Sequence, residues 1–263
     1  MKKKPWLKSE ITFVLKQHKK GLSRKQIAKE FNSKYNSDRS QDSIKHCIDT
    51  HGLSIEKDIK KVLIIDIETR SLVVKTWGLF DQNIGLNQVV EDGGILSWSA
   101  KWIGSDTVLY KDVKGDKSKE KELLAPLWKL MDDADIVIGQ NSNSFDIKKL
   151  NAKFLEYNLG CPSEYKKIDT LRMARKHYGF LSNKLEYLSK KLCTIKKLAH
   201  SKFPGFSLWD QCEKGNKEAW KEMKIYNMAD VSATEELFLK LSEFDKTIPT
   251  TDALRAYQAA KKK

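Results

Sequence analysis

The segment Val62-Leu63-Ile64-Ile65-Asp66-Ile67-Glu68-Thr69 constrains the fold of this chain more than any other part of the sequence. Its four successive β-favouring apolar residues predict a central strand that is covered on both faces. Asp66 and Glu68 are two residues apart, so their side chains project from the same face of that strand. Burying two neighbouring carboxylates is costly unless a cation neutralises them, and Mg²⁺ or Mn²⁺ prefers such oxygen ligands. The alternative interpretation is a strand that simply ends in a polar loop.

A second apolar strand is expected over residues 135–139, followed by a polar segment that ends in Asp146. Ser144 is a suitable N-cap for the next helix, which would place Asp146 in its first turn and continue to about Tyr157. An aspartate at this position also interacts favourably with the helix dipole, which is the competing explanation for it.

A long helix is expected to begin near Lys217. Tyr226 and Asp230 are four residues apart and therefore share one face of this helix. A phenol and an acid at that spacing are able to address a metal-bound water together. The alternative is an amphipathic helix with a half-buried tyrosine.

In combination, these three segments resemble the DEDD 3′–5′ exonuclease superfamily, in the tyrosine variant that includes the exonuclease domains of family B DNA polymerases. The motifs are D-x-E at the end of a strand, N-x-x-x-F-D after a second strand and Y-x-x-x-D on a late helix, and the resemblance covers roughly residues 61–245. It implies an RNase H-like fold in which four carboxylates hold two Mg²⁺ or Mn²⁺ ions astride the scissile phosphate, while Tyr226 orients the attacking water. The implied metal ligands are Asp66, Glu68, Asp146 and Asp230.

Two further residues are weighed against this resemblance. Asp169 is interpreted as the N-cap of a helix that contains Leu171 and Ala174, and it is left out of the metal set. The nearest histidine upstream of Asp230 is His200, thirty residues earlier, so the histidine variant of the superfamily is disfavoured.

The implied activity is hydrolysis of a nucleic acid from its 3′ end with release of nucleoside 5′-monophosphates. DNA is favoured over RNA, with single-stranded or frayed 3′ ends as substrate. Substrate contacts are expected from Thr69, Asn141, Phe145 and Trp77, whereas Trp98 and Trp102 fit core packing on one face of a strand over residues 94–103. The alternatives are a catalytically inactive DNA-binding regulator, a ribonuclease on the same fold, and an endonuclease or transposase.

The charge of the chain is concentrated near its N-terminus. The whole sequence has 49 Lys and Arg against 35 Asp and Glu, a net charge of +14, and residues 1–61 alone hold 16 against 7. A positive field of this size favours phosphate backbones, although solubility is the competing explanation.

Residues 1–50 read as three short helices, at Lys8–His18, from Ser23 to Phe31, and from a cap at Ser40 or Asp42 onward. Each has an apolar inner face. These segments resemble trihelical helix-turn-helix modules of the Myb-like kind, which implies nucleic-acid binding through the third helix. A helical bundle that docks onto protein is the alternative. The expected inner-face residues are Ile11, Val14, Leu15, Ile27, Ala28, Phe31, Ile44, Cys47 and Ile48, and the expected outer-face contacts are Arg39, Gln41, Lys45 and His46.

The predicted fold class is α/β, an RNase H-like mixed sheet flanked by helices, with a small all-α N-terminal domain. Residues 1–55 form the helix-turn-helix domain and residues 56–263 the exonuclease domain, with a linker over residues 52–60. Strands are expected near 62–67, 94–103, 106–111, 135–139 and 166–168. The expected partners are nucleic acid and a polymerase or other replication or repair protein.

The remaining expectations concern the cellular setting. The sequence has no apolar run of the roughly 20 residues that a membrane span needs. Its four cysteines are widely spaced and form no zinc pattern with the histidines, which predicts neither structural zinc nor disulfides and a cytoplasmic location.

Overall fold

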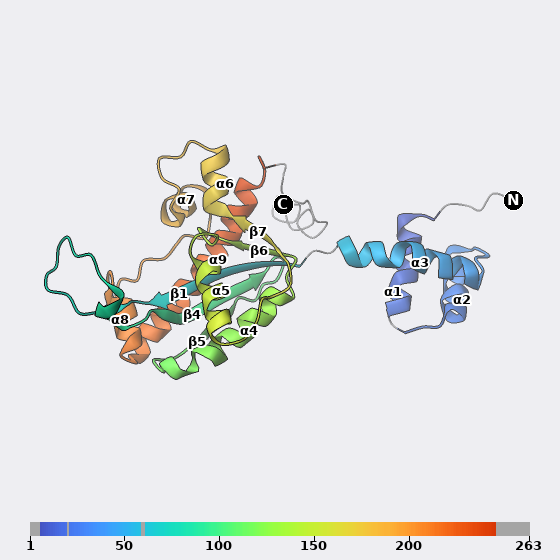
Figure 1. The fold of residues 1–263 in the computed structure, drawn as a ribbon. Coiled ribbons are helices and arrows are strands. Elements are labelled where there is room, and N and C mark those ends of the chain that lie inside the picture. Colours follow the sequence, from blue (N-terminus) through green and yellow to red (C-terminus); the bar gives the residue numbers. More distant parts are fainter. Residues whose placement is uncertain (1–5, 20, 59–60, 246–263) are drawn as a thin grey trace. The chain divides into compact units, whose positions relative to one another are not determined.

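The structure, a computed structural model, describes residues 6–19, 21–58 and 61–245 (Figure 1). The chain divides into two compact units, Met1–Ile59 and Lys60–Lys263. No helix in the described part of the chain combines the length and apolar character required of a membrane span.

Within residues 6–58, the N-terminal unit consists of the helices α1 (Lys8–Lys19), α2 (Arg24–Tyr35) and α3 (Gln41–Asp58), which pack against one another in pairs. A capping box starts α2, because the Ser23 side chain accepts from the Gln26 backbone N–H and the Ser23 backbone donates to the Gln26 side chain. The Ser40 hydroxyl accepts from the Ser43 backbone N–H and so caps α3. The buried core matches the inner faces expected from the sequence and consists of Val14, Ile27, Ala28, Phe31, Ile44 and Cys47.

Two boundaries in this unit differ from expectation. Helix α2 continues to Tyr35, whose ring packs 4.7 Å from that of Phe31 and extends the aromatic core by a further turn. Helix α3 continues to Asp58, so residues 52–58 are helical and the expected linker there is wrong. A single glycine inside a helix, here Gly52, costs only about 1 kcal/mol, which was not enough to end α3.

The described residues of the second unit form a five-stranded sheet in the order β5-β4-β1-β6-β7. Its strands are β1 (Val62–Arg70), β4 (Gly94–Trp102), β5 (Leu109–Asp112), β6 (Ile136–Gly139) and β7 (Lys166–Asp169). Strand β1 pairs antiparallel with β4 and parallel with β6, so the sheet is mixed, as predicted. β5 begins three residues later than the sequence suggested.

Helices cover both faces of this sheet, because successive residues of β1 point to opposite sides. Leu63, Ile65 and Ile67 pack with α4 (Glu120–Asp132) and α5 (Asp146–Glu156) in one core cluster. Val62 and Ile64 pack on the other side with α6 (Thr170–His177), α7 (Leu185–Leu192) and α9 (Lys217–Leu241). Both faces of the central strand are therefore buried, as its apolar run predicted. The remaining elements are α8 (Ser207–Glu213), the two-residue strand β2 (Val73–Val74), the strand β3 (Val89–Glu91), and the short 3₁₀ helices η1 (Leu86–Gln88) and η2 (Lys117–Lys119).

The two tryptophans of β4 belong to the core, as expected. Trp98 is 4% exposed, and its indole N–H donates to the Leu123 carbonyl at 2.7 Å. Trp102 is partly buried against the same core cluster. The Trp98 ring is therefore not accessible to a substrate.

The segment between β1 and β4 extends beyond the end of the sheet (Figure 1). β2 and β3 pair as a short antiparallel ribbon, and the loop between them carries apolar side chains that face solvent. Trp77 is 100% exposed, and Leu79, Phe80 and Leu86 are exposed by more than four-fifths. Exposed large apolar side chains gathered on one loop indicate a binding element.

Candidate active site

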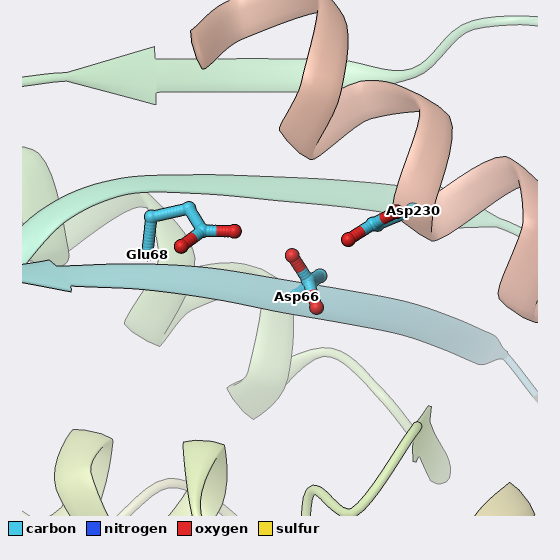
Figure 2. A group of neighbouring side chains, drawn as sticks. All are labelled: Asp66, Glu68 and Asp230. Atoms are coloured by element: carbon cyan, nitrogen blue, oxygen red, sulfur yellow. The ribbon is translucent and has the colours of Figure 1, made fainter. Parts of the chain in front are cut away.

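Three carboxylates meet between β1 and α9. Asp66 and Glu68 project from the same face of β1, and Asp230 approaches from α9; Figure 2 shows the three side chains directed into one space. One ligand oxygen from each lies within 4.8 Å of the others. This proximity arises because the two-residue period of β1 turns both acids toward the face that α9 covers.

Asp146 lies next to this group but outside it. It is the first residue of α5, is 4% exposed, and accepts a hydrogen bond from the Ile67 backbone N–H at 3.1 Å through Oδ1. Strand β6 pairs with β1 only as far as Ile64, so the Ile67 N–H has no strand partner on that edge. The carboxylate of Asp146 takes the place of that missing strand residue.

The start of α5 corrects the expectation that Ser144 is its N-cap. The helix begins one residue later, the residue before it is Phe145, and no side chain caps it. The loop instead closes on Asn141, which has a left-handed backbone (φ 61°) and whose carbonyl accepts from the Ser144 and Phe145 N–H groups. Turn formation at Asn141 therefore determines where the helix starts.

Asp169 holds this loop in place. Its carboxylate accepts from the Asn141 N–H at 3.0 Å and the Asn143 N–H at 3.2 Å. The same carboxylate caps α6 through the backbone N–H groups of Leu171 and Arg172. The N-cap prediction for Asp169 is confirmed, and the contacts to the loop before Asp146 add a positioning role that the sequence did not reveal.

Burial raises the pKa of the four carboxyl groups predicted as metal ligands. It raises the pKa of Glu68 to about 7, against the lowering effect of a hydrogen bond from Trp209. It raises the pKa of Asp146 to about 7, against the hydrogen bond from Ile67. The pKa of Asp66 lies well above its usual value because of burial and then the neighbouring carboxylates, and burial also raises that of Asp230. Such a cluster is stable in its ionised form only beside positive charge.

Lys197 supplies one such charge, and sequence reasoning missed it. Its ammonium group forms an ion pair with Asp230 Oδ2 and lies 4.3 Å from the centre of the Tyr226 ring. Burial lowers the pKa of Lys197, but attraction to Asp230 and Tyr226 outweighs this and leaves that pKa above its usual value. No spacing in the sequence signals this contact, because Lys197 lies in an irregular segment after α7.

Two other missed residues hold the acids of β1. The Asn227 amide donates to Asp66 Oδ2 at 2.5 Å and accepts from the Ser97 hydroxyl at 3.2 Å. The Trp209 indole N–H, from α8, donates to Glu68 Oε2 at 2.9 Å. Asn227 is three residues before Asp230 on α9, so helical spacing is a signal that would have found it. Nothing in the sequence pairs Trp209 with Glu68.

Tyr226 is buried among rings at the edge of this group. Its ring lies 5.9 Å from that of Trp209 and 5.3 Å from that of His200, both edge to face. Burial raises the pKa of Tyr226 to about 12, so its phenol keeps its proton at neutral pH. A cavity of about 350 Å³ opens beside Tyr226 and Lys197, and its other lining residues are Glu186, Leu198, Ala199, His200, Ser201, Pro204 and Gly205.

The four residues expected to contact the substrate differ in exposure and in the element that carries them. Thr69 is half-buried in β1, directly after Glu68. Phe145 is 38% exposed, with the Lys149 ammonium 5.3 Å from its ring centre. Asn141 is exposed at the turn before α5, and Trp77 stands on the loop between β2 and β3. Thr69 and Phe145 are therefore each next in sequence to a carboxylate of the candidate site, Asn141 lies in the same loop as Phe145, and Trp77 stands on a different loop.

In the N-terminal unit, Gln41, Lys45 and His46 are exposed on α3, as expected. Arg39 differs, because it precedes α3 and packs inward. Its guanidinium group lies 4.2 Å from the centre of the Trp6 ring and 4.0 Å from Glu10. The expectation of an outer-face position for Arg39 is therefore wrong, since stacking on Trp6 draws its side chain toward the core.

A family model for the RNase_H superfamily matches residues 91–242, more than half of the chain. The chain belongs to the RNase_H superfamily. The match includes α5 and α9 but begins after β1, so the structure is needed to place Asp66 and Glu68 in the same domain. No curated protein matches the sequence.

Among solved structures, this RNase_H superfamily member is similar to the family B DNA polymerase from the hyperthermophilic archaeon Pyrobaculum calidifontis. The TM-score is 0.51 at 14% identity, over 70% of this chain and 25% of that one. The chain thus spans about a quarter of that polymerase. At this identity the likeness shows the fold alone.

Proposed function

We propose that this protein is a metal-dependent nuclease, and more specifically a 3′–5′ exonuclease that releases nucleoside 5′-monophosphates from single-stranded or frayed 3′ ends, with DNA favoured over RNA. The observation that carries the proposal is the meeting of Asp66, Glu68 and Asp230 oxygens within 4.8 Å, with Asp146 on the adjacent edge of β1. Membership of the RNase_H superfamily and the polymerase-like fold support it.

The residues at this site fit hard divalent cations. The donors are carboxylate oxygens, which Mg²⁺ and Mn²⁺ prefer. Among the described residues, the buried Oδ1 of Asp230 has no hydrogen-bond partner, as expected of an atom whose ligand is a metal. We assign Asp66, Glu68, Asp146 and Asp230 as the ligands of two ions. When bound, such ions supply a water nucleophile at neutral pH and stabilise charge that develops on a phosphate.

The chain's own residues position this ligand set. Asn227 holds the Asp66 carboxylate and Trp209 holds that of Glu68, so both acids on β1 have a fixed orientation. The ion pair with Lys197 favours the ionised form of Asp230, against the burial that raises its pKa. The protonated phenol of Tyr226 is suited to orient a water by a hydrogen bond, because a group with a pKa of about 12 does not act as a base at neutral pH.

The terminal nucleotide is assigned to the cavity beside Tyr226, whose volume of about 350 Å³ is in the range of small-ligand sites. Phe145 and Trp77 are partly or fully exposed rings that are available for base stacking. Thr69 and Asn141 are assigned to polar contacts with the same nucleic-acid strand. The N-terminal unit is assigned to nucleic-acid binding through Gln41, Lys45 and His46, with Arg39 supporting it, and a polymerase or other replication protein is the proposed partner.

The test uses matched 5′-labelled DNA and RNA oligonucleotides, single-stranded or with recessed 3′ ends, in Mg²⁺, Mn²⁺ or EDTA. The Asp230→Asn protein is run alongside, with Asp106→Asn, an exposed aspartate, as the matched control. We expect a metal-dependent ladder that shortens from the 3′ end, present in the control and absent in Asp230→Asn. Intact oligonucleotides in every lane, with binding still visible by gel shift, would contradict the exonuclease and favour a DNA-binding regulator.

A further inference from the structure

A second charged feature lies apart from the carboxylates, in a groove between β5, the start of α4 and the first turns of α9. Its cavity volume is about 670 Å³. Lysines from four separate parts of the chain surround it, while its acidic lining residues are Asp112 and Glu122. The lysines are Lys111, Lys114, Lys119, Lys217, Lys221 and Lys224.

This groove concentrates the positive charge of the catalytic unit. Residues 62–263 contain 33 Lys and Arg against 28 Asp and Glu, a net charge of +5. The six lysines and two acids that line the groove account for +4 of it. Charge that served solubility alone would be spread over the surface, whereas charge gathered along a concave surface attracts anions.

Several of these lysines have no carboxylate that neutralises them. Lys111 donates to the Glu122 backbone carbonyl at 3.2 Å, and the Lys224 ammonium lies 5.8 Å from the centre of the Tyr110 ring. Among the ion pairs of residues 61–245, none involves Lys114, Lys217 or Lys224. Lys119 and Lys221 form exposed ion pairs with Asp116 and Glu218. Holding the other ammonium groups together with little counter-charge is unfavourable, so the groove favours an anionic ligand.

The lysines of α9 form a row on the side away from the carboxylates. Lys217, Lys221 and Lys224 follow the i, i+4, i+7 spacing of one helix face. At 1.5 Å per residue the row is about 10 Å long, which is enough to contact more than one phosphate of a strand. At about 100° per residue, Tyr226 lies roughly 140° around the helix from Lys221. The groove is therefore a surface separate from the proposed catalytic site.

We propose that this groove binds the phosphate backbone of a nucleic acid, several nucleotides away from the cleaved 3′ end. The inference rests on the proposed function for the identity of the ligand and extends it to a second binding surface. Aromatic side chains line the groove between the lysines, with Trp220 buried and Tyr110 half-buried. The partly exposed Tyr110 ring among these lysines is available for base stacking, a feature of sites that bind single-stranded nucleic acid.

The test compares two triple variants of the full chain that lose the same charge. One is Lys217→Gln, Lys221→Gln and Lys224→Gln. The other is the control Lys129→Gln, Lys190→Gln and Lys240→Gln, three exposed lysines of α4, α7 and α9 that do not line the groove. Both carry Asp230→Asn to prevent cleavage. Fluorescence anisotropy measures the Kd of 20-nucleotide and 4-nucleotide single strands over a range of salt concentrations.

For the 20-mer we expect the slope of log Kd against log salt to fall by about 2 in the groove variant, because each lost phosphate contact contributes about 0.7. The control variant should keep nearly the parental slope, and the 4-mer should bind all three proteins equally. An unchanged slope in the groove variant, or an equal fall in the control, would overturn the inference. So would loss of polyglutamate binding with nucleic-acid binding intact, which would assign the groove to an acidic protein segment.

The two proposals fail separately. If no form of the protein cleaves an oligonucleotide but the groove variant still shows a smaller slope of log Kd against log salt, the proposal for the groove holds and the exonuclease proposal does not. If cleavage is normal and the slope is unchanged, the exonuclease stands and the groove does not. With Asp230 intact, the groove variant should cleave the 4-mer at the parental rate and show a raised KM on the 20-mer alone.

Discussion

Replacing Glu68 by glutamine should make the metal-free protein more stable while abolishing its proposed activity. Glu68 is half-buried beside Asp66 and Asp230, so at alkaline pH it carries a charge that the surroundings oppose (Figure 2). Glutamine has nearly the same shape, and its amide oxygen is able to accept the Trp209 N–H in the same way. The substitution therefore removes the charge and leaves the packing almost unchanged.

The size of the effect follows from the pKa of Glu68, which is about 7 in the folded protein against an ordinary value of 4.5. At 1.36 kcal/mol per pKa unit, ionising this group costs the folded state on the order of 3 kcal/mol. The folded state holds the proton more tightly than the unfolded state. The free energy of unfolding of the parent protein therefore falls as pH rises from about 4.5 to about 7 and levels off above. The Glu68→Gln protein has no charge to acquire at this position, so its free energy of unfolding does not fall for this reason.

The assay is urea unfolding in EDTA at several pH values between 4.5 and 8.5, followed by tryptophan fluorescence. At pH 8 the Glu68→Gln protein should exceed the parent by on the order of 3 kcal/mol, and near pH 4.5 the two should nearly coincide. Glu164→Gln, at an exposed glutamate of the same unit, is the matched control and should follow the parent at every pH. Saturating Mg²⁺ should stabilise the parent and the control far more than Glu68→Gln, because a metal that binds only the folded state raises its stability.

Two results would refute this reasoning. If Glu68→Gln is less stable than the parent at pH 8 in EDTA, the carboxylate is not under electrostatic strain and the folded state stabilises its charge. If the variant gains stability equally at pH 4.5 and pH 8, the gain does not come from removing a charge. Equal stabilisation of variant and parent by Mg²⁺ would remove Glu68 from the ligand set.

Four further predictions test other parts of the structure. In the parent protein the hydrogen bond from Trp209 lowers the pKa of Glu68. Trp209→Phe removes this bond and should shift the acidic limb of the kcat/KM profile to higher pH; an unshifted profile in Mg²⁺ would contradict this. Asp169→Ala should lower the free energy of unfolding by about 2 kcal/mol, since an N-cap is worth up to about 2 kcal/mol, and should reduce kcat because Asp169 holds the loop before Asp146. Asp169→Asn should retain most of the stability, measured by urea unfolding, and most of kcat, measured in steady-state assays. Trp77→Ala should raise the Kd for a single strand by roughly 5-fold to 100-fold, the range of one base stack, without changing Tm, because the ring is 100% exposed; unchanged affinity in an anisotropy titration would exclude it from the substrate path. Deleting residues 1–60, the N-terminal unit with the residue that follows it, should raise KM and flatten its salt dependence with kcat retained, whereas loss of kcat at unchanged KM would mean that the unit supports the catalytic site rather than binding substrate.

Much of the fold was predictable because apolar periodicity reports which face of an element is buried. The run of β1 predicted a strand covered on both sides, and the two-residue period placed Asp66 and Glu68 on one face. The three-helix core of the N-terminal unit followed from the same reasoning. Local chemistry was also readable, since Ser23 and Asp169 cap the helices that follow them.

The limits of local patterns appeared where two signals competed. Residues 52–60 were predicted to be a linker, but the cost of Gly52 in a helix is small and α3 continues to Asp58. Ser144 was a plausible cap, but the turn at Asn141 shifts the start of α5, and the Ile147 N–H that such a cap would have bound donates to the Ser142 carbonyl instead. In both cases the outcome depends on a balance of about 1 kcal/mol, which residue preferences alone do not decide.

The sequence by itself predicted the strands of the sheet, the buried faces of several helices and the acids assigned to the candidate site. Only the tertiary structure decided what surrounds those acids: Asn227 on Asp66, Trp209 on Glu68 and Lys197 on Asp230. Each contact joins elements that are far apart in the chain or have no common period, and the lysine groove is assembled from separate segments in the same way. A periodic pattern records the direction of a side chain relative to its own strand or helix. It contains no information about which other element will pack against that side, because that choice is made by the burial of the whole core.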